Sequence, residues 1–309
     1  MHNINGFQDF IEANKLSKYV FTNYSLKDFT SIKTGGPARF FVETDDLNKI
    51  RMIFKFICEN NIEHEIIGNG SNLLISDVGY DGVVISLKKI PKKLDKENTY
   101  LFASANIESA NLIENCMKFE LSGLEFLSGI PGTVGGMIEM NAGAFEHSIG
   151  DFLREIIIIN ENGIFEKILS EDIKFDYRFI DMNRKYYIIV GGTFKLKRGS
   201  KTQIKDLCNQ YNAIKSSKFN RNFFSFGSVF KNGKNYIAGE LLDKCGLKGY
   251  QIGDAQVYER HANFIINLGN ASSKDIYSLI TVMRDKVLEK FNIELIPEVR
   301  LWGDFSYAT

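Results

Sequence analysis

Apolar residues recur at helical spacing in several separate parts of the chain. Leu47, Ile50 and Phe54 show this pattern directly after an Asp-Asp pair that can cap a helix. A longer run of apolar residues at helical spacing follows Ser272 and Ser273, and either serine can cap the helix that it predicts. The helices that these patterns predict span residues 5–15, 47–61, 107–117, 201–218, 236–245 and 272–291.

Shorter apolar runs between these helices predict strands. Asn162-Gly163 is a dipeptide typical of a tight hairpin, so we expect the runs on either side of it to pair. The mixed order of strands and helices predicts an α+β fold, and the polar run 197–200 is the boundary expected before the last region. The predicted strands are 38–44, 64–68, 73–76, 83–87, 99–104, 155–159, 164–169, 186–196, 256–267 and 293–302.

Residues 123–143 form a glycine-rich stretch that we interpret as the centre of a ligand site. Six of its twenty-one residues are glycine, and Pro131 is one of only four prolines in the chain. Glycine lets the backbone approach a ligand closely, so N–H groups here can line a phosphate or a planar ring. The alternative is an ordinary surface loop, but apolar residues such as Phe126 and Met137 are interleaved with the glycines.

A second glycine-containing loop, GNGSN at residues 68–72, connects two predicted strands. Gly68 and Gly70 free the backbone, while Ser71 and Asn72 add hydroxyl and amide donors that suit a diphosphate. A tight turn with self-capping side chains is the competing interpretation. The loop is not the G-x-G-x-x-G fingerprint of a Rossmann fold, and the chain has no P-loop sequence.

Composition narrows the class of protein. Of 309 residues, 44% are hydrophobic and 25% charged, with 38 basic against 38 acidic side chains. This balance gives no overall field to hold nucleic acid or an anionic membrane. The four cysteines are far apart and the four histidines lack ligand spacing, so we expect reduced core thiols and no metal site. With no signal peptide or membrane span in the sequence, we expect a cytoplasmic protein.

Three positions can carry chemistry, although each has a simpler interpretation. Ser228 in SFGSVFKNG follows a glycine and precedes Lys231 by three positions, which favours a proton donor over an acylated nucleophile because no G-x-S-x-G elbow surrounds it. A lone serine is otherwise satisfied locally. Arg178 and Glu298 can equally be surface charges, and His261 a hydrogen-bonded strand residue.

Taken together, these motifs resemble the UDP-N-acetylenolpyruvoylglucosamine reductase family, and the resemblance covers nearly the whole chain. The pieces that carry it are TSIKTGGPA (30–38), IGNGSNLLI (67–75), GLEFLSGIPGTVGGMIEMNAGAF (123–145), YR (177–178), GSVFKN (227–232), AGELLDKCGLKGYQIGDAQVYERHANFIIN (238–267) and PEVR (297–300).

The resemblance implies a fold and a set of site residues. The fold is an FAD-binding domain of the vanillyl-alcohol-oxidase type, made of two α+β subdomains at 1–88 and 89–199, with a C-terminal α+β substrate-binding domain at 200–301; residues 302–309 are candidates to return to the first subdomain. The implied catalytic residues are Ser228, Arg178 and Glu298. The implied residues around non-covalent FAD are Gly68, Asn69, Gly70, Ser71, Asn72, Pro131, Gly132, Thr133, Gly135, Gly136, Asn141, Ala142 and Gly143. The implied substrate-binding residues are Lys218, Lys231, Asn232, Lys248 and His261.

The implied reaction uses NADPH and FAD to reduce UDP-N-acetylglucosamine enolpyruvate to UDP-N-acetylmuramate for peptidoglycan synthesis, with no obligate protein partner. The sequence departs from the family pattern at Gly233-Lys234, at Phe179-Ile180 and at Phe226, which is expected to crowd Ser228. The short segment after Arg178 leaves no room for a tyrosine-bearing insertion and indicates the type II branch.

Two alternatives belong to other classes of protein. A related flavin oxidase would share the glycine-rich loops, but it has no need of the GSVFKN and PEVR segments and often carries a histidine for covalent flavin attachment. A catalytically silent nucleotide-sugar binding protein would keep the substrate segments but lose Ser228, Arg178 or Glu298, and all three are present.

Overall fold

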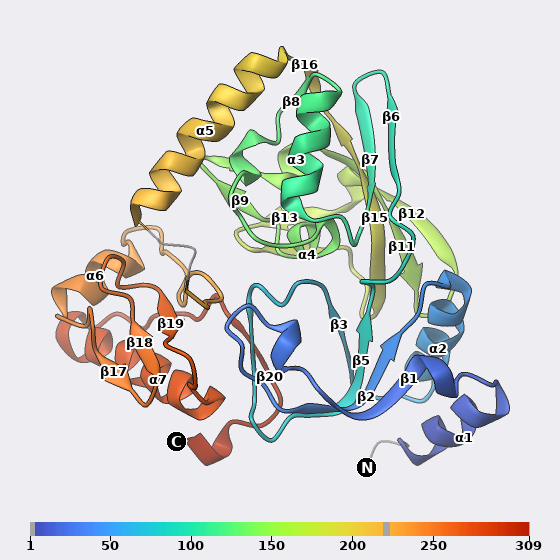
Figure 1. The fold of residues 1–309 in the computed structure, drawn as a ribbon, viewed down its shortest axis with the longest axis horizontal. Coiled ribbons are helices and arrows are strands. Elements are labelled where there is room, and N and C mark those ends of the chain that lie inside the picture. Colours follow the sequence, from blue (N-terminus) through green and yellow to red (C-terminus); the bar gives the residue numbers. More distant parts are fainter. Residues whose placement is uncertain (1–3, 219–222, 309) are drawn as a thin grey trace. The chain divides into compact units, whose positions relative to one another are not determined.

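A computed structural model describes residues 4–218 and 223–308 of the chain, which forms two compact units (Figure 1). Unit 1 comprises Met1–Phe21, Phe40–Asn69 and Gly82–Lys215, and unit 2 comprises Thr22–Arg39, Gly70–Asp81 and Ser216–Thr309. Each unit therefore draws on segments that are far apart in the sequence. The three contiguous domain ranges expected from the sequence stay a prediction.

The N-terminal elements include a four-stranded sheet in the order β1-β2-β5-β3, in which β3 runs parallel to β5. Its helix α2 begins behind Asp46, whose carboxylate accepts the N–H of Asn48 at 2.9 Å, and its apolar face is buried in a cluster that includes Phe7 and Phe54. The elements are α1 (Asn5–Ala13), β1 (Val20–Ser25), β2 (Pro37–Glu43), α2 (Leu47–Glu59), β3 (His64–Ile67) and β5 (Tyr80–Ser86).

The second part of unit 1 is a five-stranded antiparallel sheet in the order β12-β11-β15-β7-β6. Gly163 closes the β11–β12 hairpin at φ +69°, and its N–H donates to the carbonyl of Asn160 at 2.8 Å, as the Asn-Gly pair predicts. The strands are β6 (Leu94–Glu97), β7 (Tyr100–Ser104), β11 (Leu153–Asn160), β12 (Phe165–Leu169) and β15 (Tyr187–Lys195).

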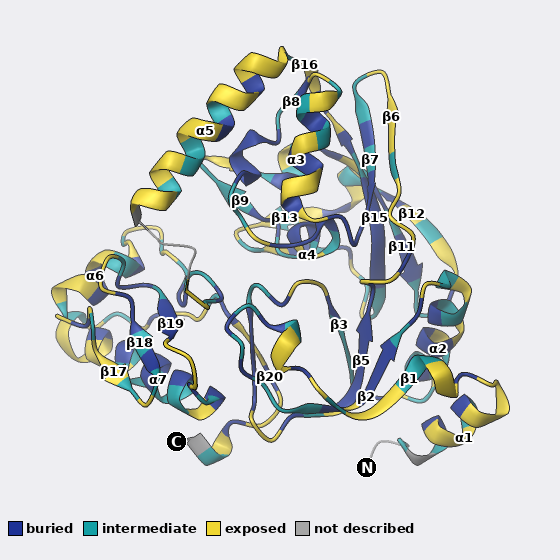
Figure 2. Cartoon of the chain, in the orientation of Figure 1, coloured by how far each residue is buried: buried dark blue, intermediate teal, exposed yellow. Residues whose placement is uncertain are grey.

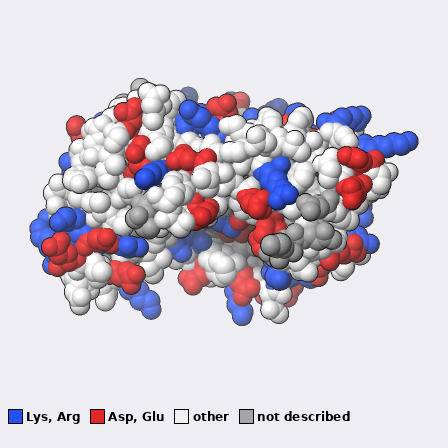
Figure 3. Space-filling view, turned by 90° about the horizontal axis from the view of Figure 1, so that it is seen from below, with Lys and Arg blue, Asp and Glu red and all other residues white. Residues whose placement is uncertain are grey.

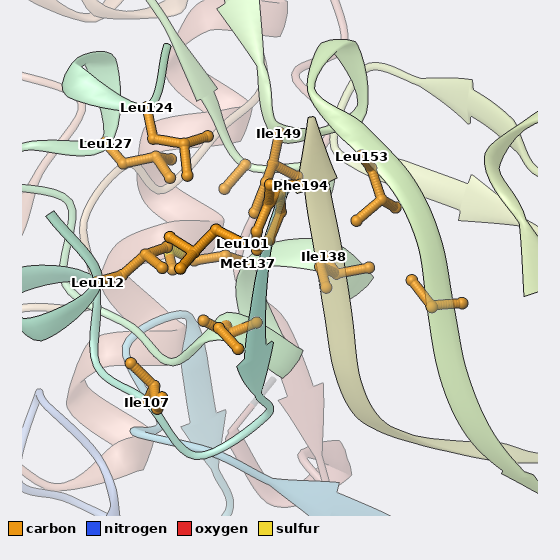
Figure 4. Packing of buried hydrophobic residues seen from close by; sticks show 14 of the residues in the cluster. Leu101, Ile107, Leu112, Leu124, Leu127, Met137, Ile138, Ile149, Leu153 and Phe194 are labelled. Carbon is orange, nitrogen blue, oxygen red and sulfur yellow. The ribbon is translucent and has the colours of Figure 1, made fainter. Parts of the chain in front are cut away.

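Helices and short strands cover this sheet and hold the glycine-rich stretch against it. The short helix α4 packs on β15 and β7, and Figure 4 shows Met137 beside Leu101 in the core. The remaining elements of unit 1 are α3 (Ser109–Lys118), β8 (Leu121–Ser122), α4 (Val134–Glu139), β9 (Gly143–Ala144), β10 (His147–Ser148), β13 (Lys174–Asp176), β14 (Phe179–Asp181), β16 (Lys197–Arg198) and α5 (Lys201–Lys218).

Unit 2 has its own core, packed around the long helix α7, whose inner face is buried in Figure 2. Ser272 caps α7 by accepting the N–H of Asp275 at 3.0 Å, and the Asp77 carboxylate accepts two further N–H groups of its first turn. The elements are β4 (Leu73–Ile75), α6 (Ala238–Lys244), β17 (Gln251–Ile252), β18 (Ala255–Val257), β19 (Ile265–Asn267), α7 (Ser273–Phe291) and β20 (Arg300–Trp302); β20 runs parallel to β4, and the other strands form an antiparallel sheet in the order β17-β18-β19.

Three expectations about local structure were wrong. The predicted strand 256–267 is two short strands, β18 and β19, and His261 lies in the turn between them, where its N–H donates to the Tyr258 carbonyl at 3.2 Å. The predicted strand 293–302 is regular only at Arg300–Trp302, since Pro297 has no N–H to donate. The glycine-rich stretch is not loop throughout, because Val134–Glu139 is helical.

The cysteines are free thiols, and burial decides their ionisation. Cys116 and Cys208 are buried as expected, whereas Cys58 and Cys245 are half-buried. Burial raises the pKa of Cys116 to about 12, so this thiol stays protonated at neutral pH.

In the described part of the chain, no helix is long and apolar enough to cross a membrane. No three His, Cys, Asp or Glu side chains among those residues are grouped to hold a metal. Positive and negative side chains are interspersed on the face shown in Figure 3, in keeping with the equal numbers of basic and acidic residues.

The buried phenylalanine of β15 provides a test of this core. Phe194 has no exposed surface, so Phe194→Ala should lower the free energy of unfolding by about 3 to 5 kcal/mol, because it leaves a cavity between the sheet and its cover. Phe165→Ala, at a 41% exposed position of the same sheet, should cost about 1 kcal/mol or less. Urea denaturation followed by circular dichroism measures both, and equal losses would contradict the packing described.

Candidate functional site

Two extended segments of unit 2 bring Ser228 and Glu298 to neighbouring positions. The carbonyl of Val229 accepts the N–H of Glu298 at 2.8 Å, and the N–H of Lys231 donates to the Ile296 carbonyl at 2.9 Å. Ser228 and Glu298 are both half-buried. Two of the three predicted catalytic residues, 70 positions apart in the sequence, are therefore held close by backbone pairing.

The departure at Phe226 is absorbed by the core. Phe226 is 2% exposed and belongs to the hydrophobic cluster of unit 2, while Gly227 takes φ +86° between it and Ser228. A non-glycine residue is strained at that φ, so glycine is required for the chain to change direction here.

The unit 2 half of the GNGSN loop is bonded to these same segments. Asn72 donates its side-chain N–H to the carbonyl of Glu298 at 3.0 Å, and the Asn72 carbonyl accepts the N–H of Arg300 at 3.0 Å. Gly70 lies at φ +56°, where an added Cβ would fall 2.0 Å from the Phe29 carbonyl oxygen. The packing of the chain itself thus requires glycine at residue 70, and the loop is fixed relative to Glu298.

A hydroxyl that the sequence analysis did not single out completes this cluster. Ser31 donates its hydroxyl to the carbonyl of Ser225 at 2.7 Å, and its N–H donates to the carbonyl of Gly70 at 3.1 Å. Ser31 therefore ties the glycine loop to the segment that carries Ser228. Its place within TSIKTGGPA, one of the segments that carry the resemblance, was the available signal.

Within unit 1, the two predicted cofactor segments meet at Gly68. A Cβ on Gly68 would lie 2.7 Å from the hydroxyl oxygen of Thr133, so residues 65 positions apart are in contact. Asn69 and Gly68 are exposed beside this contact. The structure thus brings together one end of the GNGSN loop and the centre of the glycine-rich stretch.

The backbone donors of the glycine-rich stretch fall into two groups. The N–H groups of Val134 and Gly135 donate to the carbonyls of Ile107 and Ala105, at 2.8 and 2.9 Å, so they are not available to a ligand. Among the described residues, no hydrogen-bond partner is found for the amides of Gly132, Thr133 and Gly136. Backbone N–H groups next to glycines can bind the phosphates of a dinucleotide without a charged side chain. This suits a chain whose basic and acidic residues are equal in number.

Gly136 differs from the other glycines of the stretch. It is exposed, and a Cβ built on it would meet only the Thr133 hydroxyl, at 3.7 Å. Gly135 is confined by the Ala105 side chain at 2.9 Å, and Gly143 by the His147 carbonyl at 2.6 Å. Packing of the chain explains Gly135 and Gly143 but leaves Gly136 open to close approach by a ligand.

The last residues of the predicted cofactor set support the chain. Asn141 is buried at φ +38°, donates to the carbonyl of Asp176 at 2.9 Å and accepts the N–H of Gly150 at 3.1 Å. Ala142 is buried in the core of unit 1, and Pro131 is exposed. Asn141 thereby holds the hairpin that carries Arg178.

Arg178 occupies the two-residue turn between β13 and β14, where Asp176 pairs with Phe179. Its φ is +59°, and its guanidinium lies over the Tyr177 ring at 5.0 Å from the ring centroid. A non-glycine residue in this conformation costs on the order of 1 kcal/mol, and such strain concentrates at functional sites. Eleven other non-glycine residues in the described part of the chain also have a positive φ, so the backbone conformation alone does not set Arg178 apart.

The predicted substrate residues of unit 2 occupy varied environments. Lys231 is half-buried, Lys248 is ion-paired with Asp243 at 2.6 Å, and Asn232 accepts the N–H of Ala238 at the start of α6. His261 is half-buried, with Nδ1 accepting the Asn263 N–H at 3.3 Å. The side chain of Lys218 lies outside the described part of the structure.

Comparison with known proteins gives matches to both parts of the chain. Residues 219–302 match the family model described as the UDP-N-acetylenolpyruvoylglucosamine reductase C-terminal domain, and residues 38–168 match an FAD-binding domain. The chain is 38% identical to the UDP-N-acetylenolpyruvoylglucosamine reductase of Clostridium novyi (strain NT) over 92% of both chains, and 34% identical to that of Clostridium tetani over 97% of this chain and 99% of the relative.

A solved structure agrees with these relatives. The crystal structure of UDP-N-acetylenolpyruvylglucosamine reductase from Thermus caldophilus is similar at a TM-score of 0.75, with 30% identity over 92% of this chain and 98% of that one. The matches confirm the predicted order of an FAD-binding domain and a C-terminal domain in an α+β fold, with FAD as the cofactor. The roles of individual site residues stay predictions.

Substitutions at two glycines can distinguish an effect on stability from an effect on FAD binding. Gly136→Leu places a better helix former in α4, so the melting temperature of the flavin-free protein should stay at or above the wild-type value while bound FAD falls. Gly70→Ala should lower both, because its backbone is strained and its Cβ meets the Phe29 carbonyl. Absorbance of bound flavin and thermal denaturation measure the two effects; full flavin content in Gly136→Leu would contradict the assignment.

Proposed function

The chain belongs to the UDP-N-acetylenolpyruvoylglucosamine reductase family, and we propose that it reduces UDP-N-acetylglucosamine enolpyruvate to UDP-N-acetylmuramate, with NADPH as hydride donor, in peptidoglycan precursor synthesis. The observation that best supports this proposal is the hydrogen bond that joins Glu298 to Val229, the residue after Ser228. A nucleotide-sugar substrate and NADPH also favour a cytoplasmic location.

FAD, when bound, supplies two-electron chemistry: it accepts a hydride from NADPH and donates one to the substrate. In our proposal, the free amides of Gly132, Thr133 and Gly136 hold its phosphates, and the bare backbone of Gly68 and Gly136 allows close approach. Buried residues of the glycine-rich stretch, such as Met137, keep water from the site.

Ser228 is the proposed proton donor. Addition of hydride to the terminal vinyl carbon of the substrate leaves negative charge on the neighbouring carbon and on its carboxylate, and the Ser228 hydroxyl delivers a proton to that carbon. The half-buried position of Ser228 limits competition from water. The hydride and the proton together convert the C=C bond into the saturated lactyl ether.

Arg178 and Glu298 are the proposed stabilisers of the developing charge. A guanidinium can bind the substrate carboxylate through two N–H groups, and Arg178 presents one from the turn between β13 and β14. Glu298 acts in its protonated form or through a water. Its segment is fixed by hydrogen bonds to Val229 and Asn72, which supports a precise location.

The remaining proposed contacts are to the nucleotide-sugar. A ligand with a diphosphate and hydroxyl groups needs cations and hydrogen-bond donors. The residues proposed to supply them are Lys218, Lys231, Lys248, Asn232 and His261. The Lys248–Asp243 ion pair is exposed and therefore weak, so it can open for a phosphate. The direct continuation from Arg178 into β14 supports the loopless type II branch.

Removal of the Ser228 hydroxyl tests the proposed reaction. Ser228→Ala should leave FAD content and flavin reduction by NADPH unchanged, but slow reoxidation by the enolpyruvyl substrate about 10² to 10⁴-fold, because only that half-reaction needs the proton. Ser278→Ala, at a half-buried serine of α7, should change neither half-reaction. Stopped-flow absorbance separates the halves; wild-type reoxidation in Ser228→Ala would exclude this serine as the donor.

The Arg178 charge gives an independent test. Arg178→Met keeps an unbranched side chain but removes the guanidinium cation, so reoxidation by substrate should slow about 10² to 10³-fold while flavin content stays the same. Arg184→Met is the control in the same unit, since Arg184 pairs with Glu166 and has no proposed contact with the substrate. Equal effects of the two substitutions on reoxidation would show that Arg178 has no special role.

A further inference from the structure

A buried asparagine clamps the segment that carries Ser228. Asn263 is 4% exposed, and both ends of its side-chain amide are used: Oδ1 accepts the N–H of Phe230 at 3.0 Å, and Nδ2 donates to the Phe230 carbonyl at 2.8 Å. Its own carbonyl accepts the N–H of Val229 at 2.9 Å. We infer that Asn263 is a positioning residue that sets the location of the Ser228 hydroxyl, an inference that rests on the proposed function.

The partners fix the orientation of this amide. An N–H can only donate and a carbonyl can only accept, so the Phe230 backbone admits one placement of the oxygen and nitrogen of Asn263. The side chain thus takes the place of a neighbouring strand for a segment that forms isolated β-bridges on either side, at Ser228–Phe264 and Phe230–Pro297. Within the described residues, no regular ladder includes this segment, so loss of the clamp would leave its backbone groups with fewer partners.

The clamp also lies between the proposed substrate and proton-donor residues. The backbone N–H of Asn263 donates to Nδ1 of His261. The Asn263 carbonyl accepts the N–H of Val229, and the Val229 carbonyl in turn accepts the N–H of Glu298 at 2.8 Å. A disturbance at Asn263 therefore reaches Ser228, Glu298 and His261 together. Because a misplacement of about 1 Å can cost about 10²-fold in rate, such a residue affects the reaction without touching the substrate.

Asn263→Asp is the sharpest variant. It keeps the shape of the side chain, but an ionised carboxylate cannot donate to the Phe230 carbonyl, so two acceptors face each other. Asn267→Asp is the matched control: Asn267 is 2% exposed and equally satisfied, but its side chain bonds to Ile32, Gly269 and Ala271, away from Ser228.

The inference predicts a different outcome for each variant. Both should lower the melting temperature, but only Asn263→Asp should slow substrate-driven reoxidation, by about 10 to 100-fold, with flavin reduction by NADPH unchanged. Its solvent deuterium isotope effect on reoxidation should rise, because proton delivery becomes the slower event; a purely structural role would leave that effect at the wild-type value. Equal reoxidation rates in the two variants would overturn the inference.

Two further results keep the test decisive. If wild-type enzyme, reduced by NADPH, is not reoxidised by the enolpyruvyl substrate, the proposed function fails rather than the role of Asn263. Should Asn263→Asp not fold, hydrogen–deuterium exchange on the wild-type holoenzyme decides: the Val229 and Phe230 amides should exchange as slowly as those of β18 and β19. Rapid exchange at both amides would refute the clamp.

Discussion

Pairing through one buried residue, Val229, governs the candidate site in unit 2. Val229 has no exposed surface. Its carbonyl accepts the N–H of Glu298, and its own N–H donates to the carbonyl of Asn263. Neither paired segment belongs to a regular sheet, so each hydrogen bond matters individually, and an unmade one would leave a buried polar group unsatisfied. The hydrophobic core of unit 2 holds Val229 in place, and in this way apolar packing supports the backbone bonds next to Ser228 and at Glu298.

The glycines of the predicted cofactor loops exist for different physical reasons. Gly70 has a left-handed backbone and lies against the Phe29 carbonyl, and Gly68 and Gly135 are confined by neighbouring side chains. Gly136 has room for a side chain within the protein, so its glycine is best explained by a ligand. A glycine-rich motif therefore combines folding requirements with binding requirements, and only the geometry separates them.

Local signals predicted most regular elements well. The helix 201–218 has the predicted limits, Asp46 and Ser272 cap α2 and α7, and Asn162-Gly163 closes a hairpin, because caps and tight turns depend on a few adjacent residues. The errors at 256–267 and 293–302 have different causes: Pro297 interrupts the second segment, whereas a turn divides the first. An alternating apolar pattern is the same for one long strand and for two short strands joined by a turn, and the choice depends on partners far away in the sequence.

The sequence by itself determined the α+β class, the two glycine-rich loops, the family and the identity of the residues that can do chemistry, because these depend on local composition and on motifs. It could not distinguish Arg178 or Glu298 from ordinary surface charges, and it gave no weight to Ser31 or Asn263. Tertiary structure shows what surrounds these residues: Arg178 lies in the turn between β13 and β14, and hydrogen bonds between distant segments, such as Asn72 to Glu298, fix the backbone at Glu298. Such contacts form only when distant segments pack together, and no local pattern records them.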